Sequence, residues 1–143
     1  TGANLRGADL TDAHLTDADL TDAKGLQYRL ACPDVGTITA WKKCESSDVA
    51  NAVVIVKLRI PEDAKRSSAT TNKCRADKVE VLGIETMDGV TLPDDFEAYS
   101  SRAFDFKYHK GDVLTVDDFD ENRWNECAPG IHFFINRIDA VNY

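Results

Sequence analysis

The stretch that decides the fold of the N-terminal part reads ANLRG ADLTD AHLTD ADLTD over residues 3–22. Alanine and leucine each return every five residues. The repeated positions are Ala3, Ala8, Ala13, Ala18, Leu5, Leu10, Leu15 and Leu20. This period matches neither the apolar stripe of a helix nor the alternation of a strand. It predicts a backbone that turns a corner with every repeat, so that alanine and leucine point toward a shared axis while aspartate and threonine face water.

The pattern strongly resembles the pentapeptide-repeat family, whose A(D/N)LXX units build a right-handed, four-sided β-helix. Four units stand in register and a fifth decays at Gly25-Leu26, so the resemblance implies a single coil over residues 1–25. A solenoid coil cannot bury its core alone and needs neighbours that cap it. We therefore expect one side of the coil to pack on the following domain. The other side is expected to continue into further repeats of a longer native chain, or to stack on a second copy and give a homo-oligomer.

The charge of the chain bears on its partners. Seventeen basic and 25 acidic residues give a net charge of −8. Phosphate neutralisation needs clustered lysine and arginine, so the composition argues against direct nucleic-acid binding. Some pentapeptide-repeat proteins imitate DNA and inhibit topoisomerases, and the resemblance leaves open a DNA-mimicking inhibitor of a DNA enzyme in the full-length protein. One coil is too short for such a rod, and outward aspartates also keep a β-helix soluble.

The apolar runs and the cysteines bear on the location of the protein. The longest apolar run, residues 52–56, has five residues and is too short for a membrane helix. A signal-peptide pattern is not visible at the first residues, and the four cysteines show no CxxC spacing. We therefore expect no membrane association, a reducing compartment, and a cytoplasmic or virion-associated protein.

From Leu26 onward the five-residue period is lost and strand signals begin. Segments rich in β-branched and aromatic residues, separated by turn residues, are typical of strands. They predict strands at residues 36–42, 52–60, 78–85, 103–108, 113–116 and 131–135. Hairpin turns are expected at Asp88-Gly89 and at residues 109–112. In the last predicted strand Phe133 is expected to face the core and His132 the opposite side.

Short helices are expected at residues 62–66, after a proline, and at residues 137–142, after Asn136 as a cap. Segments 43–51 and 117–129 are expected to be loops. The predicted fold class is therefore mostly β (α+β). One coil of right-handed pentapeptide-repeat β-helix, residues 1–25, leads into a compact β-rich domain with short helices, residues 26–143.

Two segments of this second domain carry a further resemblance. They read VVIVKLRIPEDAKRSSATTNKCRADKVEVLGI (53–84) and ECAPGIHFFINRIDAVNY (126–143). Both resemble an uncharacterised C-terminal domain that follows pentapeptide repeats in phage, prophage and bacterial proteins. The similarity extends from about Leu30 to Tyr143. It implies a phage or prophage setting and no established activity.

Cysteine and histidine provide the candidates for chemistry. Cys127 and His132 flank a Pro-Gly turn, and a thiol with a neighbouring imidazole can act as nucleophile and base. Thiolates and an imidazole also suit tetrahedral zinc, for which Cys44, Cys74, Cys127 and His132 are the candidate ligands. The alternative for the cysteines is that they are small buried hydrophobic residues. The alternative for the histidine is a hydrogen bond within the turn and strand.

The main concentration of basic residues lies between residues 65 and 75. The candidate ligand-binding residues there are Arg66, Ser67, Ser68, Lys73 and Arg75. Arginine together with hydroxyl groups can hold a phosphate or a carboxylate. The alternative is a solvated loop whose cations pair with the acidic surface.

The absence of a complete catalytic constellation in this sequence favours a non-catalytic function without a cofactor. We expect a structural and protein-interaction module that caps a β-helical rod and binds an unidentified protein, in a phage or prophage setting. The alternative is an enzyme or a small-ligand and anion-binding domain. It would use Cys127 and His132 together with the loop of Arg66, Lys73 and Arg75.

Overall fold

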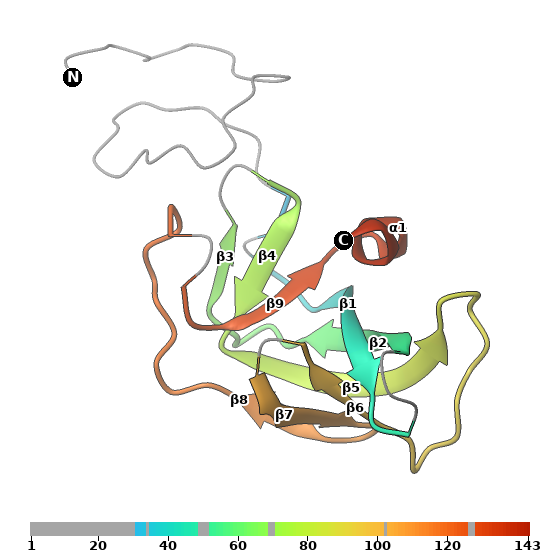
Figure 1. Ribbon diagram of the computed structural model, residues 1–143. Coiled ribbons are helices and arrows are strands. Elements are labelled where there is room, and N and C mark those ends of the chain that lie inside the picture. The colour runs from blue at the N-terminus through green and yellow to red at the C-terminus, as the bar shows by residue number, and fades with distance from the viewer. Residues whose placement is uncertain (1–30, 34, 49–51, 69–70, 102, 126–127) are drawn as a thin grey trace, which may run out of the picture.

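The structure is a computed structural model that describes residues 31–33, 35–48, 52–68, 71–101, 103–125 and 128–143 (Figure 1). The predicted repeat coil and Cys127 lie outside the described residues. The described part is a mostly antiparallel β domain with one short helix, as the sequence predicts. Its elements are β1 (Ile38–Ser46), β2 (Val53–Ile60), β3 (Arg66–Ser68), β4 (Lys73–Ala76), β5 (Lys78–Thr86), β6 (Glu97–Ser100), β7 (Ala103–His109), β8 (Val113–Thr115), β9 (Ile131–Phe134) and α1 (Arg137–Asn142).

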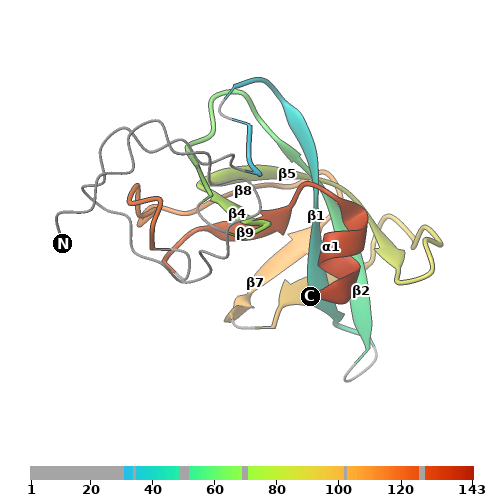
Figure 2. The ribbon, with the colours of Figure 1, turned by 90° about the horizontal axis from the view of Figure 1, so that it is seen from above.

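The strands form one antiparallel sheet in the order β3-β4-β9-β1-β2-β5-β8. In addition, β6 pairs with β1 and with β7. The sheet bends round itself (Figures 1 and 2), and the main core receives buried side chains from strands that are far apart in this order, such as β4 and β5. The main core contains, among others, Cys74, Val81, Tyr108 and Phe133.

Strand β2 shows why this sequence forms a central strand. Its residues VVIVKLRI are β-branched or aliphatic at almost every position, which is typical of a strand covered on both faces. Val56, Leu58 and Ile60 enter the main core, whereas Ile55 enters a second cluster on the other face. Fully burying a side chain of this size contributes roughly 1.5–3 kcal/mol.

Helix α1 covers the second face of the sheet, next to β1 and β2 (Figure 2). Its Ala140 packs with Ile55 and Phe134, and Trp41 lies at the margin of this cluster. Arg137 fixes the start of the helix, because its guanidinium donates to the carbonyl oxygen of Thr86 at 2.9 Å and pairs with Glu85. The predicted helix at residues 137–142 is confirmed, although the Asn136 side chain makes no capping hydrogen bond.

Several details of the last strand and the first hairpin are also confirmed. Phe133 is fully buried in the main core, and His132 lies on the opposite face of β9. The Asp88-Gly89 turn is closed by a hydrogen bond from the Thr86 amide to the Val90 carbonyl at 2.9 Å. Gly89 has a φ of 91°, a conformation that glycine adopts without strain.

The predicted helix at residues 62–66 is wrong. A turn stands in its place, with the Ala64 amide bonded to the Pro61 carbonyl at 3.1 Å, and Arg66 already begins β3. The guanidinium of Arg66 holds the Pro61 carbonyl at 2.8 Å. This tertiary contact, together with the pairing of β3 with β4, outweighs the weak local helix preference.

Two further expectations are corrected. The predicted loop at 43–51 begins too early, because β1 continues to Ser46 with Cys44 packed in the core. The turn at residues 109–112 exists, with the Asp112 amide 3.1 Å from the His109 carbonyl oxygen. Its flanking strands do not form a hairpin, since β7 pairs with β6 and β8 pairs with β5.

None of the described helices is long and apolar enough to cross a membrane.

Candidate functional site

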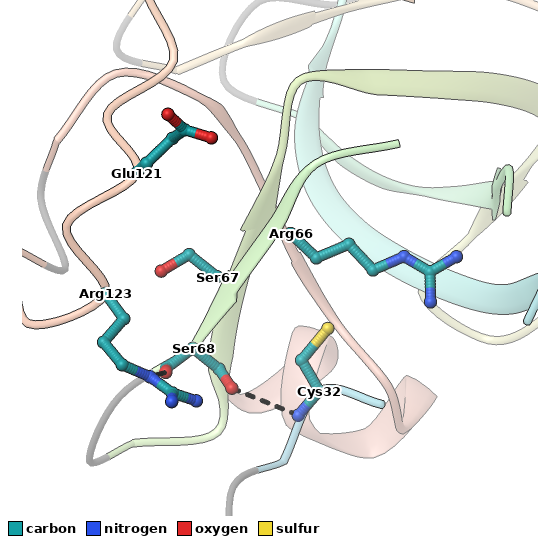
Figure 3. Close-up of a pocket in the computed structure, with 6 residues that line it drawn as sticks. All are labelled: Cys32, Arg66, Ser67, Ser68, Glu121 and Arg123. Atoms are coloured by element: carbon teal, nitrogen blue, oxygen red, sulfur yellow. Dashed lines mark hydrogen bonds between the residues drawn. The ribbon is translucent and has the colours of Figure 1, made fainter. Parts of the chain in front are cut away.

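A polar pocket of about 210 Å³ lies beside β3 and contains several of the predicted ligand-binding residues (Figure 3). Its described lining consists of Cys32, Arg66, Ser67, Ser68, Glu121 and Arg123. In Figure 3, Ser67 points toward the side where Glu121 and Arg123 lie, whereas Arg66 extends away from them. The hydroxyl-rich strand predicted to hold an anion is therefore in a pocket, but its arginine is directed elsewhere.

Arg66 is engaged with backbone carbonyl groups. We call residues 31–33 and 35–37 the connecting segment, because they join the predicted repeat region to the sheet. Arg66 donates from Nη1 to the Pro33 carbonyl at 3.1 Å and from Nη2 to the Gly36 carbonyl. The Oγ of Ser68 accepts a hydrogen bond of 3.3 Å from the amide of Cys32. Arg66 and Ser68 thus hold the connecting segment against the end of the sheet.

Arg75 is buried on the other face of the β3–β4 hairpin. Its guanidinium donates to the carbonyl oxygens of Asp120, Asn122 and Pro129 and lies within hydrogen-bond distance of the Ser67 hydroxyl. Burial lowers the pKa of Arg75, and the charge of Asp120 partly offsets this effect. With its donors directed at the protein itself, Arg75 is a structural side chain that organises the loop of residues 117–129.

The predicted cationic trio is therefore divided between two faces. Ser67 pairs with Arg75 in the antiparallel register, whereas Arg66 pairs with Ala76. Because side chains alternate along a strand, Arg66 and Arg75 point to opposite faces of the hairpin. Lys73 lies on the face of Arg75, two residues earlier in β4. The structure does not bring these three cations to one point.

Lys73 and His132, in contrast, line the same small pocket, of about 60 Å³. A larger pocket of about 380 Å³ adjoins it. The two pockets share Lys42, Ser100 and His132. We call the two pockets together the lysine groove.

The position of the lysine groove follows from how β1 is paired. Strand β2 follows one edge of β1 along almost its whole length. On the other edge, β9 pairs at Trp41 and β6 pairs at Glu45 and Ser46. Residues 42–44 lie between these two pairings, where β9 and β6 separate. Lys42 of β1, Ser100 of β6 and His132 of β9 border this gap, which explains why they line both pockets.

The structure does not bring the described candidate zinc ligands together. Cys74 pairs with Phe133, which faces the core, whereas His132 lies on the opposite face of β9, so these two predicted ligands are separated by the sheet. Burial raises the pKa of the Cys44 thiol to about 12. A hydrogen bond with the Cys32 thiol, reinforced by burial, raises the pKa of the Cys74 thiol. Both thiols are thus buried and held in the neutral form.

The other predicted ligand, Cys127, lies outside the described residues, so its pairing with His132 as nucleophile and base stays a prediction. Within the part of the chain that the structure describes, no three side chains of histidine, cysteine, aspartate or glutamate lie close enough to hold a metal ion. Cys44 and Cys74 are not in disulfide bonds.

Sequence reasoning missed Lys42, Lys43 and Tyr143 of the lysine groove. Adjacent lysines in a strand otherwise rich in apolar residues are the signal that could have directed attention to Lys42 and Lys43. Tyr143 offers no such signal, because only the return of α1 across the sheet brings it beside Lys73.

The fold and the repeat pattern define a class of protein: pentapeptide repeats that lead into an antiparallel β domain. Comparison with known families agrees, since the pentapeptide repeats match residues 1–24. The Family of unknown function (DUF5758) matches residues 28–140, which is more than half of the chain. The chain belongs to this family, and both resemblances noted in the sequence are confirmed. No curated protein matches the chain. No solved structure matches it either.

Proposed function

We propose that residues 26–143 form a non-catalytic cap on a β-helical coil built by residues 1–25, and that this cap is a protein-interaction module at the end of the rod. The order of the two matched families supports this proposal. The repeats end at residue 24 and the following family begins at residue 28, so only residues 25–27 separate them. A connection this short leaves the two parts little freedom to move independently.

The observation that carries the proposal is how the connecting segment is held. Arg66 binds the carbonyl oxygens of Pro33 and Gly36, and Ser68 binds the amide of Cys32. Cys32 itself is buried in the main core. The chain is therefore fastened from Cys32, eight residues after the repeat match ends at residue 24, at the end of the sheet that β3 forms. A flexible tether would need none of these contacts, whereas a cap needs a fixed orientation toward the coil.

Tryptophan fluorescence can test whether the coil and the domain support each other. Trp41 and Trp124 are the only tryptophans, and both lie after the repeats, so their emission reports on the β-rich domain alone. Leu15→Asn, at a predicted core position of the coil, should lower the thermal midpoint seen by tryptophan. If the coil contributes about 2 kcal/mol to the stability of the β-rich domain, the thermal midpoint of a chain of this size should fall by about 4–8 °C.

The matched control is His14→Asn, one residue away at a predicted outward position of the same repeat. It should leave the tryptophan midpoint within about 1 °C of the parent chain. If Leu15→Asn and His14→Asn give the same tryptophan midpoint while far-ultraviolet circular dichroism shows that Leu15→Asn alters the chain, the domain does not cap the coil.

The setting we propose is a phage or prophage, with a protein as partner and a cytoplasmic or virion-associated location. What supports this setting is the resemblance of the β-rich domain to one that follows pentapeptide repeats in phage, prophage and bacterial proteins. A pull-down from a phage-bearing lysate tests it: one partner should bind saturably to the full chain and to His14→Asn, and not to Leu15→Asn.

A further inference from the structure

We propose that the lysine groove is a binding site for a small organic anion, one that carries a single carboxylate or phosphate group on an apolar body. The site is separate from the connecting segment and from the proposed capping end. The inference rests on the position of the groove, on its charge, and on the contrast between its two pockets.

The small pocket is built for an acidic group. Lys42, Lys43 and Lys73 line it together with His132. No carboxylate belongs to its described lining, although the whole chain carries eight more acidic than basic residues. Three lysines that line one small volume of about 60 Å³ give it a local positive potential that an anion would lower.

Protein contacts position the ammonium groups of Lys43 and Lys73 rather than neutralise them, and Lys42 donates to the His132 carbonyl at 3.0 Å. Lys43 donates to the Val141 carbonyl at 3.2 Å, and Lys73 donates to the Tyr143 hydroxyl at 3.2 Å. An ammonium group has three donors, so each of these bonds leaves donors for a ligand. Among the described residues, no carboxylate forms an ion pair with Lys43 or Lys73. The ammonium nitrogen of Lys73 also lies 5.3 Å from the centre of the Tyr143 ring, and this cation–π contact helps to hold the side chain in place.

The larger pocket is suited to an apolar body. Among its lining residues are Phe106, Tyr108, Val116 and Ile131, and Asp118 is the one carboxylate of its described lining. Its volume of about 380 Å³ falls in the range of pockets that hold small organic molecules. Because the two pockets share Lys42, Ser100 and His132, one ligand can place its acidic group in the small pocket and its body in the large one.

Calorimetric titration of the full chain tests the proposal with four probes. Phenyl phosphate and phenylacetate represent the two acidic groups on one apolar body. Inorganic phosphate represents the acidic group alone, and benzyl alcohol represents the body alone. We expect saturable binding of at least one of the first two, at least about tenfold tighter than either half-ligand, because both pockets contribute. Which of the two binds more tightly identifies the acidic group.

Neutral variants locate the site. Lys43→Gln and Lys73→Gln should each weaken the better probe by about tenfold, since each removes a charge-assisted hydrogen bond. Asp118→Asn should strengthen it, because it removes the carboxylate from the larger pocket. Lys107→Gln is the matched control, as Lys107 is exposed on β7 outside both pockets, and it should change the affinity less than twofold.

Binding should also change the NMR signals of the imidazole of His132, which lines both pockets, and leave those of His109 unchanged. The proposal is overturned if neither organic anion binds saturably to the parent chain. It is equally overturned if inorganic phosphate binds as tightly as phenyl phosphate, or if Lys107→Gln weakens binding as much as Lys43→Gln.

Discussion

Arg75 holds Asp120 through the backbone: its Nη1 donates to the carbonyl oxygen of Asp120 at 2.5 Å. The same guanidinium binds the carbonyl oxygens of Asn122 at 2.8 Å and Pro129 at 3.1 Å, and it stacks on the ring of Phe119 with 4.9 Å between Cζ and the ring centre. One buried side chain therefore organises a loop whose described residues form no helix or strand. Its loss would remove one donor from each of these carbonyl groups, although those of Asn122 and Pro129 would each keep a backbone amide donor.

Replacing Arg75 with methionine, which keeps an unbranched stem, should lower the free energy of unfolding by about 2–4 kcal/mol, because several charge-assisted hydrogen bonds disappear from a buried site. Urea denaturation followed by tryptophan fluorescence measures this. Arg123→Met is the control, since Arg123 is exposed and makes one long bond of 3.4 Å to Ser68. A loss at Arg75 no larger than the loss at Arg123 would contradict the structural role.

Gly130 should not tolerate alanine. Its φ of 148° is unfavourable for other residues, and an added Cβ would lie 3.2 Å from the Phe119 ring and 3.3 Å from Cβ of Arg75. Strain and crowding together should lower the free energy of unfolding by about 1–3 kcal/mol. In Gly83→Ala the added Cβ meets nothing within 4 Å, and that variant should be neutral or slightly stabilising. Equal effects of the two substitutions in thermal unfolding would contradict this view of the loop.

The buried thiol of Cys44 should make stability fall in alkali. Burial raises its pKa from 9.0 in a solvated chain to about 12 in the fold. The native state therefore keeps a proton that the unfolded state releases, and the stabilisation is fully present below pH 9.0 and is lost as the pH rises toward 12. One such group adds a slope of at most about 1.4 kcal/mol per pH unit.

This slope can be isolated by comparing the parent chain with Cys44→Ala between pH 9 and 10.5 under reducing conditions. The variant is expected to start less stable, because it leaves a small cavity, but its free energy of unfolding should fall less steeply with pH. Cys74, whose pKa is also raised, remains in both chains and cancels in the comparison. The pKa of Tyr108 is raised mainly by burial, which both chains share, and to a smaller extent by the charge of Cys44. Parallel pH dependences would show that Cys44 ionises equally easily in both states.

Arg137 should be needed to hold α1 on the sheet. Arg137→Gln removes the pair with Glu85 and the bonds to the carbonyl oxygens of Thr86 and Met87, and should increase hydrogen exchange of α1 amides by tenfold or more. Lys57→Gln is the control, because Lys57 lies over the same Trp41 ring, at 5.6 Å, without contributing to these bonds. Unchanged exchange in Arg137→Gln would show that apolar packing alone holds the helix.

Much of the strand content could be predicted because it depends on apolar residues. The six strands predicted from the sequence are all present. Among the long ones, β2 is β-branched or aliphatic at almost every position, and β5 places valine, leucine and isoleucine between polar residues. Strands β3, β4 and β6 were not predicted, since they are short and hold polar residues such as Ser67 and Arg75. These residues are strand-forming only because tertiary partners satisfy their side chains, and a local pattern does not contain that information.

The sequence predicted only part of the candidate site, because a local pattern does not show which residues the strand pairing brings together. Lys73 and His132 were both singled out, and they line one pocket. Arg66 and Arg75 were grouped with Lys73 by sequence proximity, but the register of the β3–β4 hairpin directs them to opposite faces. If the pairing of β3 with β4 were shifted by one residue, Arg66 and Arg75 would lie on the same face. The lysines of β1 lie at least 30 residues from Lys73 in the sequence, and only the pairing of β9 with both β4 and β1 brings them near it.

The position of β9 has a consequence for synthesis on the ribosome. It is the last strand in the chain, yet it lies between β4 and β1 in the interior of the sheet. Its pairs with β4 join residues that are more than 50 positions apart in the sequence. Its pair with β1, between Trp41 and Phe134, joins residues that are more than 90 positions apart. Pairings of this kind form slowly and late.

Nascent chains should therefore leave the ribosome with the repeats first and with the sheet still open between β4 and β1. The sheet can close only when Phe134 has left the exit tunnel, so a stalled chain ending before β9 would display its core to chaperones and proteases. Because β9 is synthesised after the other strands of the sheet, the domain can fold completely only once this strand is finished.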